Sequence, residues 1–465
     1  MQQCLEQALA LIRSQYGLAG GVLVAVKDGK TILKECFGLA NVEENRPVDS
    51  KTFFQMASNS KAFTTLMAAQ LCEEGKMTWD TPVKQLLPEF RMADPYVEAH
   101  VTPRDMACHR TGLCRHDIMR SLVREDRAQI VKNIAHYPVS RGFRHRQWYQ
   151  NQMYVALGYL CEQLTGQTWE QLLTERAAKP LGMEMHFRGH VDISAINAAM
   201  PYAQKNGQVY RIPEVVGQAS NPCGGMYTNL DSLERWAHTL ANGGQLDGHR
   251  ILTPESFANW ITPVLATDMG IPHPQEKGQG YALGWITSVY KGHDHVYHCG
   301  GTDGFNSMVG FFPGERMAYA LALNTWYTPA YPLLGTVLRD ILLDQVEADY
   351  TELFQIFQSM DPRPGFTAEE QKRLPLSEEE AAAFCGQYYH PGYGEMELCW
   401  ADEGLHLRYG LLDLALERVT ADRFVHYHPI SYCTTRAYFR PDGKLELTFT
   451  PDTDIPVIFE RVWWK

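Results

Sequence analysis

The sequence contains no apolar run of roughly 18 residues, the length that a membrane-spanning helix requires. Residues 1–21 (MQQCLEQALALIRSQYGLAGG) also lack the basic region and long apolar stretch of a secretory signal. Instead, Leu5, Leu9 and Ile12 recur at helical spacing, which predicts a short amphipathic helix. We therefore expect a protein without a membrane span, located in the cytoplasm.

Excess positive charge is missing as well. With 42 basic and 54 acidic side chains the formal net charge is −12. Because binding to nucleic acid requires a basic face, we expect no nucleic-acid partner. The 11 cysteines are odd in number and include no Cys-x-x-Cys pair, which favours reduced thiols over a disulfide framework. No motif calls for a cofactor, and the oligomeric state is left open.

Strand and helix patterns alternate along the first three quarters of the chain. Apolar runs flank a Lys-Asp-Gly-Lys turn and predict a hairpin. Helical patterns then dominate, strand patterns return, and a further helical stretch follows. The hairpin covers residues 20–39, the helical region 58–179 with one clear helix at 152–166, the later strands 282–325, and the last helical stretch about 333–357.

A composition change separates the C-terminal part. Residues 361–376 (DPRPGFTAEEQKRLPL) carry three prolines and many charges, which is typical of a linker. Beyond them lie short β-rich runs such as RAYFRPDGKLELTF, whose Pro-Asp-Gly marks a hairpin turn. We therefore expect a large domain at 1–360, a linker at 361–376 and a small antiparallel barrel at 377–465.

Ser58 and Lys61 are the first candidates for chemistry. The following segment, AFTTLMAAQLCEEGK, is apolar nearly all round until Glu73, which predicts a buried helix. Residues three apart share a helix face, and burial disfavours the charged form of lysine, so Lys61 could take a proton from Ser58. The competing interpretation is an N-cap serine with a solvated lysine, but Lys61 interrupts an otherwise apolar helix.

A second motif, Tyr149-Gln150-Asn151, comes just before the helix at 152–166. A tyrosine beside a lysine can serve as base and then as acid to a leaving group. An asparagine two residues on can hold a substrate amide. Taken alone, this motif favours the alternative interpretation of an aromatic core residue and an N-cap asparagine.

The third motif, His298-Cys299-Gly300-Gly301-Thr302-Asp303-Gly304, ends a strand pattern. Glycine at a strand edge lets another backbone approach, so a substrate could add there as an extra strand. The N–H of Gly301 could then pair with that of Ser58 as an oxyanion hole. The alternative is a Gly-rich hairpin turn.

In this order and spacing the motifs resemble those of the serine β-lactamase and penicillin-binding-protein superfamily, in its class C-like branch with D-aminopeptidases, DD-carboxypeptidases and esterases. That family shows Ser-x-x-Lys, then Tyr-x-Asn, then Lys/His-x-Gly. The resemblance covers roughly residues 5–345, and the tail from about 377 resembles a lipocalin-like domain. Its supporting segments are KTFFQMASNSKAFT, TPRDMACHRTGL, PLGM, PCGGMYTNLDSLERWAHTLANGG and YALGW.

The resemblance implies an α/β fold: a two-lobed β-lactamase-like domain, with an antiparallel sheet flanked by helices plus a helical lobe, followed by a small all-β barrel. It implies a serine hydrolase that acts through an acyl-enzyme on small peptide-like amides or esters. Ser58 would be acylated, and Lys61 and Tyr149 would move protons. Asn151, His298, Gly300 and Gly301 would bind the substrate.

Two departures bear on the substrate. His298 stands where typical class C β-lactamases have lysine, which favours amide or ester substrates over β-lactams. The stretch before Tyr149, RGFRHRQW, contains Arg144 and Arg146, whose planar guanidinium groups suit recognition of a substrate carboxylate. The competing interpretation of these arginines is a solvated loop.

Other interpretations remain open. They are a β-lactamase that hydrolyses β-lactam rings and a non-catalytic penicillin-binding-like sensor or binding protein. A metal site at His293, His295 and His298 is disfavoured, because alternation along a strand turns His298 away from the other two. A nucleophilic cysteine is disfavoured because none combines a helix start with a nearby base.

Overall fold

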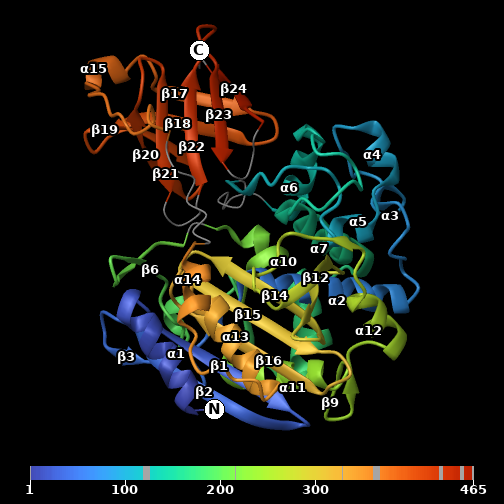
Figure 1. The fold of residues 1–465 in the computed structure, drawn as a ribbon. Helices are drawn as coiled ribbons and strands as arrows, with labels where there is room; N and C mark the ends of the chain where they lie inside the picture. The colour runs from blue at the N-terminus through green and yellow to red at the C-terminus, as the bar shows by residue number, and fades with distance from the viewer. Residues whose placement is uncertain are drawn as a thin grey trace.

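The computed structural model describes residues 2–118, 126–214, 216–326, 328–359, 367–428, 433–450 and 455–462. A large domain combines one central sheet with helices, and a small barrel lies above it in Figure 1. This arrangement confirms the fold class that the sequence predicts. Within the described ranges, no helix is both long enough and apolar enough to span a bilayer.

The central sheet is antiparallel, and its strand order is β11-β12-β13-β14-β15-β16-β1-β2-β3. The predicted hairpin at 20–39 is present, because β1 and β2 pair through a turn in which Asp28 and Gly29 have φ of 52° and 75°. The strands are β1 (Gly20–Lys27), β2 (Lys30–Asn41), β3 (Arg46–Pro47), β11 (Leu265–Ala266), β12 (Glu276–Tyr281), β13 (Ile286–Tyr290), β14 (His293–Thr302), β15 (Phe305–Phe312) and β16 (Met317–Leu323).

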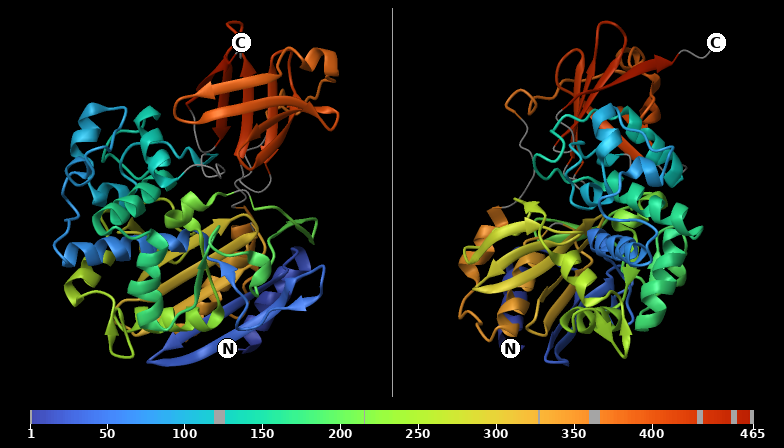
Figure 2. Two further views of the ribbon diagram at one scale, coloured as in Figure 1. Left: turned by 180° about the vertical axis from the view of Figure 1, so that it is seen from behind. Right: turned by 90° about the vertical axis from the view of Figure 1, so that its right-hand side faces the viewer.

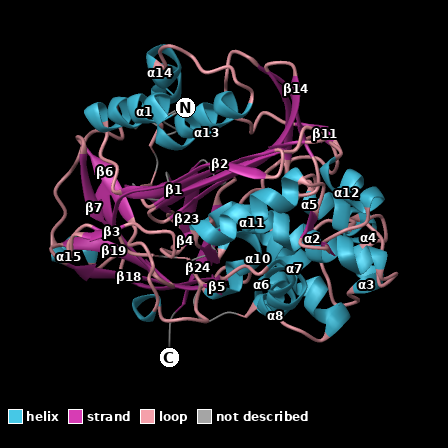
Figure 3. Ribbon diagram, turned by 90° about the horizontal axis from the view of Figure 1, so that it is seen from below, coloured by secondary structure: helices cyan, strands magenta, loops and turns pink. Residues whose placement is uncertain are grey.

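Both faces of this sheet are covered. Along β1, Val22 and Val24 join the core shared with the helical lobe, while Leu23 and Ala25 join the core on the opposite face. Figure 3 shows α1, α13 and α14 on one side of the sheet and α11 with the lobe on the other. These flanking helices are α1 (Gln2–Gln15), α11 (Leu230–Ala241), α12 (Pro254–Ile261), α13 (Ala330–Leu342) and α14 (Thr351–Ser359).

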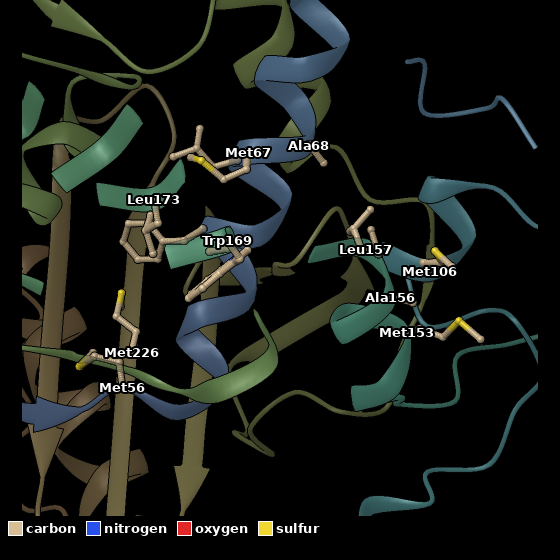
Figure 4. Close-up of a cluster of buried hydrophobic side chains, with 14 of the residues drawn as sticks. Met56, Met67, Ala68, Met106, Met153, Ala156, Leu157, Trp169, Leu173 and Met226 are labelled. Carbon is tan, nitrogen blue, oxygen red and sulfur yellow. The ribbon is translucent and has the colours of Figure 1, made fainter. Parts of the chain in front are cut away.

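The helical lobe is built around α2, whose side chains from Ser60 to Ala69 are all buried. Figure 4 shows part of its core, where Met56 lies beside Met226. The indole Nε1 of Trp169 donates to Thr64 Oγ1 at 2.9 Å. The lobe's helices are α2 (Ser60–Glu73), α3 (Val83–Leu86), α4 (Pro95–His100), α5 (Pro103–Ala107), α6 (Arg127–Asn133), α7 (Asn151–Thr165), α8 (Trp169–Leu173), α9 (Lys179–Leu181) and α10 (Asn221–Gly224).

Short strands form smaller sheets beside the central one. A three-stranded sheet has the order β4-β8-β5, and two further pairs are β6 with β7 and β9 with β10. Their bounds are β4 (Phe54–Gln55), β5 (Met185–Phe187), β6 (Tyr202–Lys205), β7 (Gln208–Arg211), β8 (Met226–Thr228), β9 (Gln245–Leu246) and β10 (His249–Arg250).

The C-terminal part is a closed barrel in which each strand pairs with its sequence neighbour and β24 returns to β17. Sequential antiparallel pairing of this kind is the up-and-down pattern of lipocalin barrels. Gly443, with φ of 83°, lies in the predicted turn between β22 and β23. The elements are α15 (Glu378–Ala381), β17 (Gly386–His390), β18 (Gly394–Ala401), β19 (Gly404–Tyr409), β20 (Leu412–Arg418), β21 (Arg423–His428), β22 (Cys433–Phe439), β23 (Leu445–Thr450) and β24 (Val457–Val462).

The predicted linker at 361–376 is described only from residue 367 onward. There, Glu370 forms an ion pair with Arg436, and the Leu374 N–H donates to the Arg418 carbonyl at 2.9 Å. This second half therefore packs on the barrel. Residues 361–366 lie outside the described part of the chain, and the domain boundaries stay a prediction.

Candidate active site

Ser58 lies in a single 3-10 turn, η1 (Ala57–Asn59), immediately before α2. Ala57 has φ of 46°, a left-handed conformation that is unusual for alanine. Ser58 is half-buried, whereas the residues on either side of it are buried. The turn is thus a sharp bend that presents the Ser58 side chain at the end of a buried helix.

Hydrogen bonds tie this turn to its neighbours. The Met56 N–H donates to the Met226 carbonyl at 2.8 Å. Ser307 Oγ donates to the Met56 carbonyl at 2.7 Å, and Asn59 Nδ2 donates to Ser307 Oγ at 2.8 Å. The nucleophile turn is therefore fixed to both β8 and β15.

Lys61 and Tyr149 both reach Ser58. Lys61 Nζ lies 3.1 Å from Ser58 Oγ and also donates to the Cys223 carbonyl at 2.7 Å. The Tyr149 hydroxyl donates to Ser58 Oγ at 2.8 Å. Lys61 is fully buried and lies 4.7 Å from the centre of the Tyr149 ring and 5.3 Å from that of Tyr154. The structure thus brings together the three residues that the sequence predicts to be catalytic.

The surroundings favour a protonated Tyr149. Burial raises the pKa of the Tyr149 phenol above its ordinary value, and the hydrogen bond to Ser58 and the charge of Arg115 offset only part of that rise. At neutral pH the phenol therefore keeps its proton and can act as an acid.

Behind Tyr149, three buried side chains form a directed chain of hydrogen bonds. The Gln150 N–H donates to His109 Nδ1 at 3.0 Å, so the hydrogen of the neutral His109 ring is assigned to Nε2. His109 Nε2 then donates to the Tyr281 hydroxyl at 3.2 Å, which donates to His298 Nε2 at 3.0 Å. His298 Nδ1 donates to the Cys299 carbonyl at 2.6 Å. The ring of His109 packs on Tyr149 with centroids 4.3 Å apart.

Both histidines of this chain are neutral. Burial and the nearby charge of Lys61 lower the pKa of His298 to about 3 and that of His109 well below 6.5. Both ring nitrogens of His298 therefore form hydrogen bonds within the protein, and the side chain is linked to Tyr149 indirectly, through Tyr281 and His109. Its predicted part in orienting the substrate stays a prediction.

The glycines of the third motif lie where β14 passes beyond β13. Tyr297 is the last residue of β14 that pairs with β13, whereas the pairing with β15 continues to Thr302. A Cβ on Gly300 would lie 2.3 Å from the Met56 carbonyl oxygen, and one on Gly301 would lie 2.7 Å from the Trp326 ring. Glycine is needed at both positions because β14 approaches the nucleophile turn and Trp326 so closely.

Asn151, the first residue of α7, is buried, and its Nδ2 donates to Asp117 Oδ1 at 2.8 Å. Asp117 Oδ2 in turn accepts hydrogen bonds from Arg115 Nε and Nη2 at 3.0 and 2.5 Å. The Arg115 guanidinium lies 5.2 Å from the centre of the Tyr149 ring. Sequence reasoning did not single out Arg115 or Asp117, whereas it had noted the segments that contain His109 and Tyr281.

The arginines before Tyr149 do not form a free basic cluster. Arg144 Nε and Nη2 donate to the two carboxylate oxygens of Asp105 at 2.9 and 2.7 Å, and Asp105 is fully buried. Asp105 also accepts from Arg110 Nε at 2.5 Å, so two guanidinium groups share one carboxylate. The guanidinium of Arg146 lies 4.1 Å from the centre of the Trp148 ring. These contacts favour a structural role for Arg144, and its binding of a substrate carboxylate stays a prediction.

The three histidines of the disfavoured metal site have separate partners. His293 Nδ1 pairs with Glu315 at 2.9 Å, and His295 Nε2 lies 3.0 Å from the Tyr319 hydroxyl. In the parts of the chain with described side chains, no cluster of three or more His, Cys, Asp or Glu residues has the geometry for a metal ion.

Comparisons with known proteins find relatives in sequence and in fold. The unguisins hydrolase ungD of Aspergillus violaceofuscus (strain CBS 115571) is 26% identical over 444 residues, spanning 83% of this chain and 75% of that protein. The octameric penicillin-binding protein homologue from Pyrococcus abyssi has a TM-score of 0.63 at 20% identity and covers 99% of each chain. The D-amino acid amidase of Ochrobactrum anthropi SV3 has a TM-score of 0.60 at 19% identity, covering 74% of this chain and 97% of the amidase.

The two structural likenesses show the same fold, and the first includes the C-terminal barrel. A family model described as Beta-lactamase matches residues 1–343, which is more than half of the chain. The resemblance that the three motifs carry is thereby confirmed, and the chain belongs to the Beta-lactamase family.

Proposed function

We propose that this protein is a serine hydrolase that forms an acyl-enzyme on Ser58 and acts on small peptide-like amides or esters. One observation carries the proposal: Ser58 Oγ lies within hydrogen-bonding distance of both Lys61 Nζ, at 3.1 Å, and the Tyr149 hydroxyl, at 2.8 Å. A hydroxyl with two proton carriers in reach is the arrangement that acyl transfer requires. The names of the relatives, a hydrolase and an amidase, support the same chemistry.

In the proposed acylation, Lys61 must first be in its neutral form. Ser58 Oγ then attacks the substrate carbonyl carbon while its proton passes to Lys61 Nζ, which becomes charged. Tyr149, kept protonated by burial, gives its proton to the leaving nitrogen or oxygen as the scissile bond breaks. Lys61 then returns a proton to Tyr149. The net result is an ester on Ser58 and a leaving group that carries the proton from Tyr149, while the proton from Ser58 replaces it on the phenol.

Deacylation reverses these roles with water as the nucleophile. Water adds to the ester carbonyl, its proton passes through Tyr149 and Lys61, and Ser58 Oγ leaves with a proton. The backbone N–H groups of Ser58 and Gly301 are proposed to hold the developing oxyanion. In the described part of the sheet, the edge of β14 from His298 to Thr302 pairs only with β15, which suits an extended substrate.

The state of His298 favours amides and esters over β-lactams. The resemblance places a lysine at this position in typical class C β-lactamases, where it would supply a positive charge. Here the ring is buried between Tyr281 and the Cys299 carbonyl, and its low pKa keeps it neutral. The site therefore lacks that cation for the carboxylate of a β-lactam.

The test compares kcat/KM for nitrocefin, D-aminoacyl 4-nitroanilides and short-chain 4-nitrophenyl esters, together with labelling by a fluorophosphonate probe. We expect amides or esters to be preferred and both turnover and labelling to vanish in Ser58→Ala. Ser60→Ala is the matched control, because Ser60 Oγ is buried at the start of the adjoining helix α2 and accepts the Met226 N–H at 3.2 Å. A preference for nitrocefin of about a hundredfold, or labelling that survives in Ser58→Ala, would overturn the proposal.

A further inference from the structure

The barrel meets the helical lobe through the turn that joins β17 to β18. The Tyr137 hydroxyl donates to the Gly392 carbonyl at 2.5 Å, and the Tyr393 hydroxyl lies 2.6 Å from His116 Nδ1. The His116 ring stacks on the Tyr137 ring, with centroids 4.2 Å apart and planes 17° apart. Tyr393 is fully buried. Figures 1 and 2 show the barrel lying against the lobe near α6.

This turn is held firmly on the barrel side. The Gly392 N–H donates to His390 Nδ1 at 3.0 Å, and the Tyr409 hydroxyl donates to the Tyr393 carbonyl at 2.8 Å. A Cβ on Gly392 would lie 2.8 Å from the Tyr137 ring, so the turn fits closely against the lobe. The barrel therefore presents Tyr393 to His116 from a fixed position.

On the other side of His116 lies the active site. Its chain neighbours Arg115 and Asp117 contact two of the three residues of the second motif: Asp117 accepts from Asn151 at 2.8 Å, and Arg115 lies 5.2 Å from the centre of the Tyr149 ring. Asp117 is buried, so its hydrogen bond to Asn151 is shielded from water. We call residues 115–117 the supporting segment.

The supporting segment has an unusual backbone. His116 has φ of 49°, a left-handed conformation that costs free energy in a histidine and persists only where the surroundings hold it. Two sets of contacts hold it here. Gln152 Nε2 donates to the His116 carbonyl at 2.5 Å, and the Tyr137 and Tyr393 side chains hold the ring. The second set of contacts therefore depends on the barrel, which supplies Tyr393.

We propose that Tyr393 of the barrel is a positioning residue for the active site, which acts through His116 to keep Asp117 on Asn151 and Arg115 on Tyr149. Loss of the contact lets His116 relax from its left-handed conformation, and this rotates Arg115 and Asp117 relative to the site. Docking of the barrel is then coupled to the activity of a site to which the barrel contributes no reacting atom. The catalytic part of this inference rests on the proposed function.

The experiment is a double-mutant cycle in the full-length chain with Tyr393→Phe and His116→Gly. Tyr393→Phe removes only the hydroxyl, while His116→Gly removes the ring and the strain, because glycine adopts positive φ at little cost. Tyr389→Phe is the matched control, since Tyr389 lies on the adjacent strand with 43% of its surface exposed. The readouts are the fluorophosphonate labelling rate of Ser58, kcat and KM for a 4-nitrophenyl ester, and hydrogen exchange of residues 113–118.

We expect Tyr393→Phe to lower the labelling rate per active site by about fivefold, the factor that one buried hydrogen bond contributes to an equilibrium. We expect no further loss when Tyr393→Phe is added to His116→Gly, and no change in Tyr389→Phe. Exchange at 113–118 should rise in Tyr393→Phe. Because rates are counted per labelled site, loss of folded protein does not imitate this result.

Equal losses from Tyr393→Phe in the wild-type and His116→Gly backgrounds would overturn the inference, as would unchanged exchange at 113–118. If the wild-type protein is not labelled at all, the proposed function fails instead. Hydrogen exchange then decides the inference alone: faster exchange in Tyr393→Phe supports the barrel's hold on the supporting segment, and unchanged exchange refutes it.

Discussion

The Tyr149 hydroxyl donates to Ser58 Oγ at 2.8 Å, although 91 positions separate the two residues in the chain. Tyr149 lies two residues before the start of α7, and its ring packs against His109, which accepts a hydrogen bond from the Gln150 N–H. Ser58 is fixed independently, through bonds between its turn and β8 and β15. The contact between the two side chains is thus set by two separate frameworks, which preorganises the pair.

Replacement of Tyr149 tests its role in proton transfer. We expect Tyr149→Phe to lower kcat by about two orders of magnitude or more, the range of a general acid–base group. Tyr154→Phe is the matched control, because its hydroxyl is buried and donates to the Ala107 carbonyl at 2.6 Å while its ring also faces Lys61. Steady-state kinetics at equal folded concentration measure both, and full activity in Tyr149→Phe would remove Tyr149 from the mechanism.

Much of the catalytic core could be predicted because its signals are local. Ser58 lies in the turn just before a helix whose apolar composition is visible in the sequence, and Lys61 lies in its first turn. Tyr149 lies just before a helix with a clear period. The supporting residues could not be found this way. His109, Tyr281 and His298 meet only after three segments pack together, and the pairing of Arg144 with Asp105 depends on tertiary contacts.

The same distinction holds for the fold. The hairpin at 20–39 is predictable because Asp28-Gly29 is a strong local turn signal. The single helical stretch predicted at 333–357 is wrong, because the structure divides it into α13 and α14. The intervening residues contain neither glycine nor proline. The chain breaks there because Asp344 adopts φ of 57° and the Tyr350 hydroxyl folds back to donate to Asp340 Oδ2 at 2.9 Å.

Buried neutral histidines should make stability depend on pH. Burial lowers the pKa of His116 and His295 to about 4 and that of His298 to about 3, from an ordinary value of 6.5. Between these values the unfolded chain binds protons that the folded chain does not, so this stabilisation is complete above pH 6.5 and declines as the pH falls toward 4. At pH 5, each of these histidines should lower the free energy of unfolding by about 2 kcal/mol relative to its value well above pH 6.5.

Urea unfolding at pH 7.5, 6 and 5 measures this dependence. We expect the free energy of unfolding to fall with pH, and His298→Gln to show a shallower dependence even though it is less stable at pH 7.5. Equal stability at pH 5 and 7.5 would show that these rings are not held neutral by the fold.

Limited proteolysis tests the proposed division into two domains. Cleavage should occur first between about residues 361 and 376. Within that range we expect the cut on the N-terminal side of Glu370, because Glu370 and Leu374 are bonded to the barrel.

The two fragments should nevertheless elute together in gel filtration, because Tyr137 and His116 hold the turn at Gly392 and Tyr393. Gly392→Ala should separate them, since the added Cβ would lie 2.8 Å from the Tyr137 ring. Uniform digestion without a stable large fragment would contradict the domain division, whereas wild-type fragments that separate at once would show that the contact with Tyr393 is too weak to position the supporting segment.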